Sequence, residues 1–289
     1  MNEPEPALND SSSEAESEHA GIAQLRKAKQ LYANDPGAKS VSFLLYGPKG
    51  CGKTTAIGTA PGPVLLYSFD PNGTQVLDEE IESGKVIPIR FEENEVEGRP
   101  VLWDRFVNTV AAHRDSGVFD LVGAVALDSF TMAFQAAIFN TKHQSGVNEK
   151  NIARAKVGKI TIPGKSDYGA TNVVIMRVIR LLANQPCHFI LTAHEETEKD
   201  GVLGDIIGDI LASPNMRVQV SIQVGEQYHI ENAPVGGKVQ RVFATVQSGR
   251  FPASTKIGAK GKLSSREPLN IAEILKKCGR EWQDKPFIT

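Results

Sequence analysis

The sequence predicts an α/β fold in which helices cover both faces of a mostly parallel β-sheet, with an antiparallel β-hairpin region added near the C-terminus. Three observations predict it. Short, continuously apolar segments alternate with segments of helical periodicity, a glycine-rich stretch joins the first apolar segment to a helix, and the pattern changes after about residue 217. The 289 residues are 40% hydrophobic and 23% charged, which suits one large domain with an appendage.

The predicted elements of the parallel part alternate along the chain. Apolar runs bounded by turn residues predict the strands, and apolar residues at helical spacing predict the helices. The order is helix 21–33, strand 40–46, helix 53–59, strand 64–69, strand 86–91, helix 101–114, strand 121–127, helix 131–140, helix 168–184 and strand 188–192. Residues 141–165 have no convincing period.

The last quarter of the chain has a different pattern, with glycine and proline between short β-forming segments. It predicts antiparallel strands at 218–225, 227–232 and 239–247 and a closing helix at 271–277. We therefore divide the chain into an acidic tail (1–20), a core (21–217) and an extension packed on that core (218–289).

The charge distribution and the composition exclude several protein classes. Residues 1–20 hold six acids and no Lys or Arg, so the remaining chain has a net charge of +4, and the tail is expected to be disordered and solvated. A tail that competes with nucleic acid for a basic groove is a second hypothesis. The acidic start is not a signal peptide, and no apolar run approaches the roughly 18–20 residues of a membrane span. Three scattered cysteines favour reduced thiols and a cytoplasmic protein.

The strongest motif is a phosphate-binding loop that fits G-x-x-x-x-G-K-[ST]. It consists of Gly47, Pro48, Lys49, Gly50, Cys51, Gly52, Lys53 and Thr54, and Thr55 completes the predicted nucleotide-binding set. The loop follows a buried strand and opens a helix, so its backbone N–H groups can turn inward around phosphates. Lys53 should reach the β- and γ-phosphates, and the Thr54 hydroxyl should ligate Mg²⁺. The predicted cofactors are therefore ATP and Mg²⁺.

Three further candidates follow predicted strands, at the edge where open α/β sheets bind ligands. Asp128 would hold Mg²⁺ together with Thr54, although an acid here can also cap the next helix. Asp70 could orient or deprotonate the attacking water, or simply start the turn that follows it. His194 could sense the γ-phosphate, or only hydrogen-bond the backbone, and Glu195 and Glu196 are weaker candidates for water activation.

These motifs together resemble the RecA-like branch of P-loop ATPases, and in particular the bacteriophage ATP-binding proteins of the AAA-domain type that include phage single-strand annealing proteins. The resemblance rests on YGPKGCGKTT, VLLYSFDPNG, AVALDSFT, SDYGATNVVIMRVIRLL and HFILTAHEE, and it covers residues 40–275. It implies a RecA-like core, Mg-ATP hydrolysis and a role in phage DNA recombination or replication. Lys53 and Thr54 match the phosphate and metal ligands, Asp128 the acid of the second motif, and His194 the sensor.

The resemblance also implies partners: single-stranded DNA, further copies of the chain in a ring or filament, and a phage single-strand binding protein. RecA-like proteins place a DNA-binding loop at the position of residues 141–165, which carry six cations and one acid. Flexible lysines there would follow phosphates without selecting a sequence, although a solvated basic loop is the alternative. Its candidate DNA-binding residues are Lys150, Arg154, Lys156 and Lys159.

A second basic run, near residues 250–266, could supply a cation to the active site of a neighbouring protomer. Arg250 and Lys256 are the candidates, with a surface loop of no catalytic role as the alternative. The sequence thus favours an ATPase that assembles on single-stranded DNA and promotes annealing or strand exchange. The other hypothesis is a nucleotide-dependent switch or assembly ATPase with a protein partner and no DNA.

Overall fold

The computed structural model describes residues 20–92, 100–148, 156–157, 160–161, 163–199, 206–235, 237–249, 251–280 and 284–287. The candidates Lys150, Arg154, Lys159 and Arg250 lie outside these residues, as does the acidic tail except Ala20.

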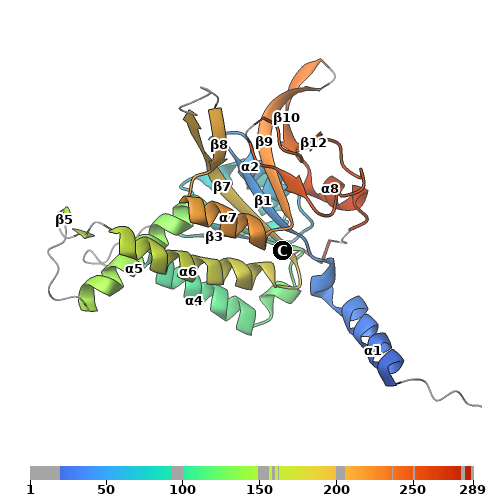
Figure 1. The fold of residues 1–289 in the computed structure, drawn as a ribbon, viewed down its shortest axis with the longest axis horizontal. Coiled ribbons are helices and arrows are strands. Elements are labelled where there is room, and N and C mark those ends of the chain that lie inside the picture. The colour runs from blue at the N-terminus through green and yellow to red at the C-terminus, as the bar shows by residue number, and fades with distance from the viewer. Residues whose placement is uncertain are drawn as a thin grey trace, which may run out of the picture.

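A single ten-stranded sheet organises the described part of the chain (Figure 1). Its main path runs β12-β10-β9-β1-β7-β4-β2-β3, and β11 and β8 pair off this path with β9 and β7. The strands are β1 Ser42–Gly47, β2 Val64–Ser68, β3 Val86–Arg90, β4 Ala124–Asp128, β7 His188–Lys199, β8 Ile206–Ile210, β9 Glu226–Val235, β10 Lys238–Ala244, β11 Ser254–Thr255 and β12 Arg266–Pro268. A separate small ribbon pairs β5 Lys156–Val157 with β6 Ile160–Thr161.

The central strands β3, β2, β4, β7, β1 and β9 are parallel, while β10 and β12 continue the sheet antiparallel. The predicted α/β class, with a mostly parallel sheet and antiparallel C-terminal strands, is confirmed. One detail differs, because β9 pairs parallel with β1 on one side and antiparallel with β10 on the other. The C-terminal extension therefore pairs, through β9, directly with β1, the strand that precedes the phosphate loop.

Helices cover the two faces of the sheet with two separate apolar cores. One core packs α4 Leu102–Asp115, α5 Phe130–Asn148, α6 Lys165–Ala183 and α7 Pro214–Gln223, and the other packs α2 Lys53–Gly58 and α8 Ile271–Lys277. Along β1, Leu44 and Tyr46 face the first core, whereas Phe43 and Leu45 face the second, as the two-residue period of a strand requires. All four side chains are buried, which is why this strand is apolar throughout.

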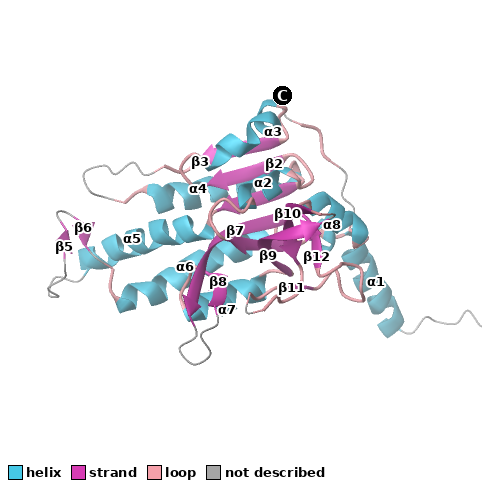
Figure 2. Cartoon of the chain, turned by 90° about the horizontal axis from the view of Figure 1, so that it is seen from above, coloured by secondary structure: helices cyan, strands magenta, loops and turns pink. Residues whose placement is uncertain are grey.

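The remaining helices are short, apart from the first. They are α1 Ala20–Asn34, α3 Asp78–Glu82 and the 3₁₀ helices η1 Pro36–Lys39, η2 Gly73–Leu77 and η3 Val118–Asp120. Helix α1 projects away from the body of the molecule (Figures 1 and 2), and its apolar residues Leu25, Leu31 and Tyr32 are exposed. Within the described ranges, no helix combines the length and apolarity that a bilayer crossing would require.

The predicted strand at 218–225 is wrong, because this segment lies mostly in helix α7. Its alternating apolar residues Val218, Val220, Ile222 and Val224 have the period of a strand. In the structure Val220 is buried, whereas Val218 and Ile222 are 61% and 65% exposed. Met216, Val220 and Val224 form the buried face at four-residue spacing. The overlooked signal is Pro214, which occupies the first turn of the helix, where proline is favoured.

Two other predicted elements are too short. The helix predicted at 131–140 continues as α5 to Asn148, and the strand predicted at 188–192 continues as β7 to Lys199. The second half of β7 leaves the parallel sheet and pairs antiparallel with β8.

We predict that the buried and the exposed apolar residues of α7 differ in their contribution to the free energy of unfolding. Val220→Ala should lower the free energy of unfolding by about 2 kcal/mol, because it removes buried methyl groups from a packed core. Ile222→Ala should change it by less than about 0.5 kcal/mol, because that side chain is exposed. Urea unfolding of both variants measures this. Equal losses would indicate that both residues share one buried face, as the strand would require.

Candidate functional site

The predicted phosphate loop connects β1 to α2 as a tight backbone turn. Gly50 and Gly52 have φ values of +78° and +105°, a region that residues with a side chain rarely adopt. At Gly47, a Cβ atom would lie 2.8 Å from the Ile230 carbonyl oxygen and 2.9 Å from Cys51 Sγ, so the close approach of β9 excludes a side chain. The glycines of the motif therefore have a structural reason as well as a chemical one.

Lys53 holds the loop closed from within. Its ammonium donates hydrogen bonds to the carbonyl oxygens of Gly47 at 2.9 Å and Pro48 at 3.0 Å, and the residue is only 6% exposed. Cys51 Sγ lies 3.8 Å from the same ammonium. Burial raises the pKa of the Cys51 thiol, and the positive charge of Lys53 opposes that rise. Lys53 thus places a positive charge inside the loop, where phosphate oxygens would bind.

Asp128, the acid at the end of β4, contacts side chains from two other elements. Its Oδ2 accepts a hydrogen bond of 2.7 Å from Thr54 Oγ1 at the start of α2, and its Oδ1 accepts one from Thr192 Oγ1 on β7. Asp128 is 1% exposed, and burial raises its pKa although the hydrogen bonds from Thr192 and Thr54 oppose the rise. Thr192 was not predicted as a site residue; the sequence signal is its position two residues before His194, at the end of an apolar strand.

Asp70 and His194 lie beside this group. Asp70 accepts a hydrogen bond of 2.9 Å from Ser129 Oγ, and its Oδ2 lies 3.5 Å from His194 Nε2. Burial raises the pKa of Asp70, but hydrogen bonds from His194 and Ser129 and the charges of His194 and Lys53 outweigh it, so that the net shift is downward. An ionised Asp70 is consistent with a role in binding a polar group such as water.

The topology explains why these residues meet. Gly47 lies opposite His194 across β1 and β7, and Ser68 lies opposite Asp128 across β2 and β4, so the phosphate loop, Asp70, Asp128 and His194 all reach the carboxyl edge of the sheet. Beside them lies a cavity of about 680 Å³. Its lining includes the loop residues and strand-end residues Lys49, Gly50, Gly52, Lys53, Thr54, Thr55, Asp70 and His194.

Arg241 on β10 also lines this cavity, and the sequence analysis did not select it. A Cβ atom at Gly52 would lie 3.2 Å from Arg241 Cδ and 2.9 Å from Leu269 Cδ2, so both side chains contact the phosphate loop. The residue lies in a strand far along the chain and belongs to no motif. Only the pairing of β9 with β1 brings it to the site.

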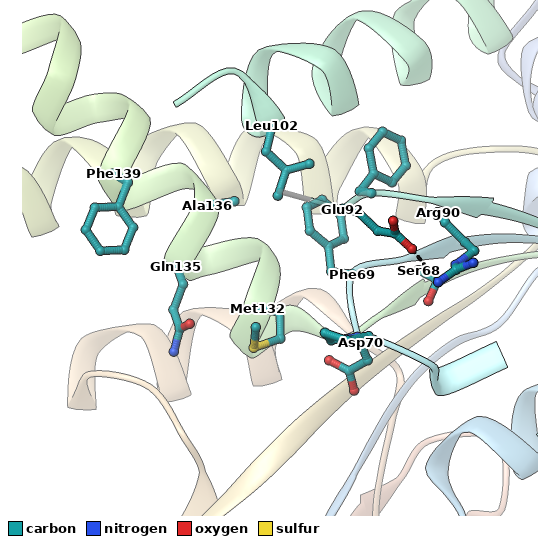
Figure 3. Close-up of a pocket in the computed structure, with 12 residues that line it drawn as sticks. Ser68, Phe69, Asp70, Arg90, Glu92, Leu102, Met132, Gln135, Ala136 and Phe139 are labelled. Carbon is teal, nitrogen blue, oxygen red and sulfur yellow. Dashed lines mark ion pairs between the residues drawn. The ribbon is translucent and has the colours of Figure 1, made fainter. Parts of the chain in front are cut away.

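A second, smaller cavity of about 300 Å³, whose lining residues are drawn in Figure 3, adjoins the first. The two cavities share Asp70, Pro71 and Met132. The second is bordered by the stacked rings of Phe69 and Phe91, whose centroids are 5.1 Å apart. Asp70 therefore borders both the cavity lined by the phosphate loop and the smaller one beside the two stacked rings.

The other candidates among the described residues do not line this cavity. Glu195 Oε2 accepts a hydrogen bond of 2.7 Å from His229 Nε2, and Glu196 pairs with Arg217 at 2.6 Å, so both carboxylates already have partners. Lys256 lies near the opposite edge of the sheet, where its ammonium donates to the Val224 carbonyl oxygen at 3.3 Å. Lys156 is in the β5–β6 ribbon.

The described residues fit a magnesium ion that also binds a nucleotide. Thr54 and Asp128 present a hydroxyl and a carboxylate, which are the hard oxygen ligands that Mg²⁺ prefers. The described part of the chain contains no cluster of three His, Cys, Asp or Glu side chains arranged to hold a metal by itself. Most of the coordination shell would therefore come from phosphate oxygens and water, as is usual for Mg²⁺ in nucleotide sites.

Comparison with known proteins identifies the class. Residues 39–229, more than half of the chain, match the family model AAA_24, described as "AAA domain", and the chain belongs to this family. It is a P-loop protein of the nucleotide-binding ATPase class. No curated protein matches it.

Among solved structures, the chain is similar to a KaiC-like protein from the archaeon Pyrococcus horikoshii OT3. The identity is 12%, the match covers 75% of this chain and 82% of the other, and the TM-score is 0.37.

We predict that Asp128 makes nucleotide binding depend on magnesium. Asp128→Asn should reduce the gain in ATP affinity on adding Mg²⁺ by about tenfold or more, because a neutral amide replaces the carboxylate beside Thr54. Titration with a fluorescent ATP analogue, in Mg²⁺ and in EDTA, measures this. Asp115→Asn, the same change on the exposed end of α4, should leave the gain unaltered. An unchanged magnesium effect in Asp128→Asn would remove this carboxylate from the metal site.

Proposed function

We propose that this protein is a RecA-like ATPase that hydrolyses Mg-ATP and acts on single-stranded DNA, promoting annealing or strand exchange in phage recombination or replication. The observation that supports hydrolysis best is the juxtaposition of Lys53, Thr54 and Asp128 at one sheet edge, with Asp70 and His194 beside them. Lys53 would bind phosphate, Thr54 and Asp128 would bind the metal, and Asp70 would position water.

In this proposal, Lys53 exchanges its hydrogen bonds to the loop carbonyls for phosphate oxygens, because the ammonium already lies inside the loop. Magnesium, when bound, would neutralise charge on the β- and γ-phosphates. Thr54 and Asp128 hold it, and Thr192 orients the Asp128 carboxylate. Asp70 orients the attacking water, and His194, next to it, senses the terminal phosphate.

The DNA-binding part rests on the basic segment 141–165. One of its cations is committed to the fold, because Lys142 forms a buried ion pair of 2.8 Å with Asp167. Lys156 lies on a short ribbon beyond the end of α5, where its position would allow contact with a long polyanion (Figure 2). The β5–β6 ribbon and the phosphate loop lie at different ends of α5. In this proposal the same helix would therefore connect the DNA site to the nucleotide site.

An assembly ATPase with a protein partner is the second candidate. The observation that favours it is the β7–β8 hairpin, which follows the sensor position and carries Glu198 and Asp209 in addition to Glu195 and Glu196, which pair with His229 and Arg217. Such an acidic hairpin repels a phosphate backbone but suits a basic protein surface. Both candidates share the proposed association of several copies in a ring or filament, with Arg250 or Lys256 supplied to a neighbouring site. A phage single-strand binding protein would be a further partner of the first.

We predict that the ATP turnover rate rises on adding single-stranded DNA. Lys53→Ala should lower turnover by about a hundredfold or more, because a preorganised cation at the phosphates is lost. Lys29→Ala, an exposed change on α1, serves as the control and should leave turnover unaltered. Phosphate release with and without DNA measures both. Turnover that is indifferent to DNA would favour the protein-partner candidate, and no turnover in any condition would contradict hydrolysis.

We predict that the basic ribbon contributes to DNA affinity through phosphate contacts alone. The double variant Lys156→Ala/Lys159→Ala should weaken binding to any single-stranded sequence and reduce the slope of log affinity against log salt by about 1.4, or ~0.7 for each lost contact. Fluorescence anisotropy across a salt series measures this. Lys238→Ala/Lys276→Ala removes the same charge elsewhere and should retain the slope. An identical slope in the ribbon variant would exclude this segment as the DNA site.

A further inference from the structure

We infer that Arg241 is a nucleotide-binding residue, which contacts the α- and β-phosphates from the C-terminal extension of the same chain. The inference rests on the proposed nucleotide site and adds to it a cation that no motif contains. It also differs from the neighbouring-protomer cations Arg250 and Lys256, because Arg241 already lines the cavity of its own chain.

The strand register directs Arg241 toward the phosphate loop. Strand β10 runs antiparallel to β9, which is itself parallel to β1, so the first half of β10 lies at the carboxyl edge of the sheet. Arg241 precedes Phe243 by two residues and therefore faces the same side. Phe243 is fully buried in the core that also contains Ile57 of α2. Arg241 thus points to the side of the sheet on which α2 begins.

The distances place the side chain against one particular part of the loop. From the position of a Cβ atom at Gly52, Arg241 Cδ is 3.2 Å away and Nη1 is 3.6 Å away. Gly52 is the glycine directly before Lys53, in the part of the loop whose backbone N–H groups cradle the α- and β-phosphates. Asp128 instead contacts Thr54. The guanidinium is therefore assigned to the phosphates that ADP and ATP share.

The charges around Arg241 indicate that the ligand of this cavity is an anion. Arg217 pairs with Glu196 and Arg266 pairs with Glu231, whereas no hydrogen bond or ion pair of Arg241 is found among the described residues. The cavity that it lines contains two further cations, Lys49 and Lys53, against one acid, Asp70, so cations are in excess. Like charges gathered in one cavity repel one another, and an anionic ligand would relieve that repulsion. A phosphate chain supplies this charge, and the planar guanidinium can donate two hydrogen bonds to it.

The test compares Arg241→Ala, Arg241→Lys and Lys238→Ala with the full-length protein. Dissociation constants for ADP and ATP are measured with fluorescent nucleotides in Mg²⁺, and inorganic tripolyphosphate is used as a competitor. Arg241→Ala should weaken ADP, ATP and tripolyphosphate alike by about tenfold to a hundredfold, the effect of one charge-assisted contact. Arg241→Lys should recover part of the loss, and Lys238→Ala should lie within about twofold of wild type.

Several outcomes would overturn the inference. Binding by Arg241→Ala within about twofold of wild type would do so. Loss for ATP with none for ADP would move the contact to the γ-phosphate, and unchanged tripolyphosphate competition would move it to the base or ribose. If the wild-type protein binds neither ADP nor ATP, the proposed function itself fails, and the two failures are therefore distinguishable. Arg241→Gln, which preserves the packing of the stem on Gly52, replaces Arg241→Ala if thermal unfolding shows that the alanine variant is destabilised.

Discussion

The hydrogen bond between Thr54 and Asp128 is the contact around which the site is arranged. It joins the start of α2, the helix that follows β1, to the end of β4. The strands β1 and β4 are not neighbours in the sheet, because β7 lies between them. The intervening strand fills the gap with Thr192, whose hydroxyl donates to the second oxygen of the same carboxylate. A fully buried acid thus receives a donor on each oxygen, which offsets the cost of its burial.

This arrangement depends on a strict division of the sheet into two faces and one functional edge. Side chains such as Tyr46 and Leu45 alternate between the two cores, and both are fully buried. The predicted site residues Asp70, Asp128 and His194 lie instead at the carboxyl edge of the parallel strands. Burial of the apolar strands in the core therefore also fixes the positions of the polar side chains that follow them at the carboxyl edge.

The same division explains what the sequence could predict. Continuous apolar strands and the glycine-lysine loop have short-range signals, so local patterns sufficed to predict the core strands and to select Lys53, Thr54 and Asp128, which the structure brings together. The placement of α7 was missed, because a helix packed on only one side can carry extra exposed valines and imitate a strand. Thr192 and Arg241 were missed for another reason. A threonine in a strand and an arginine in a hairpin are ordinary locally, and only long-range pairing gives them a partner.

The position of β1 in the sheet has a consequence for how the molecule is made. The strand that carries the phosphate loop, β1, is synthesised well before its two neighbours, β7 and β9, which begin at residues 188 and 226. Until both have left the ribosome, its backbone amides and carbonyls lack their sheet partners and Gly47 has nothing packed against it. The nascent chain must therefore protect an apolar, unpaired strand until β9 has been made. The phosphate loop can take its final shape only after that.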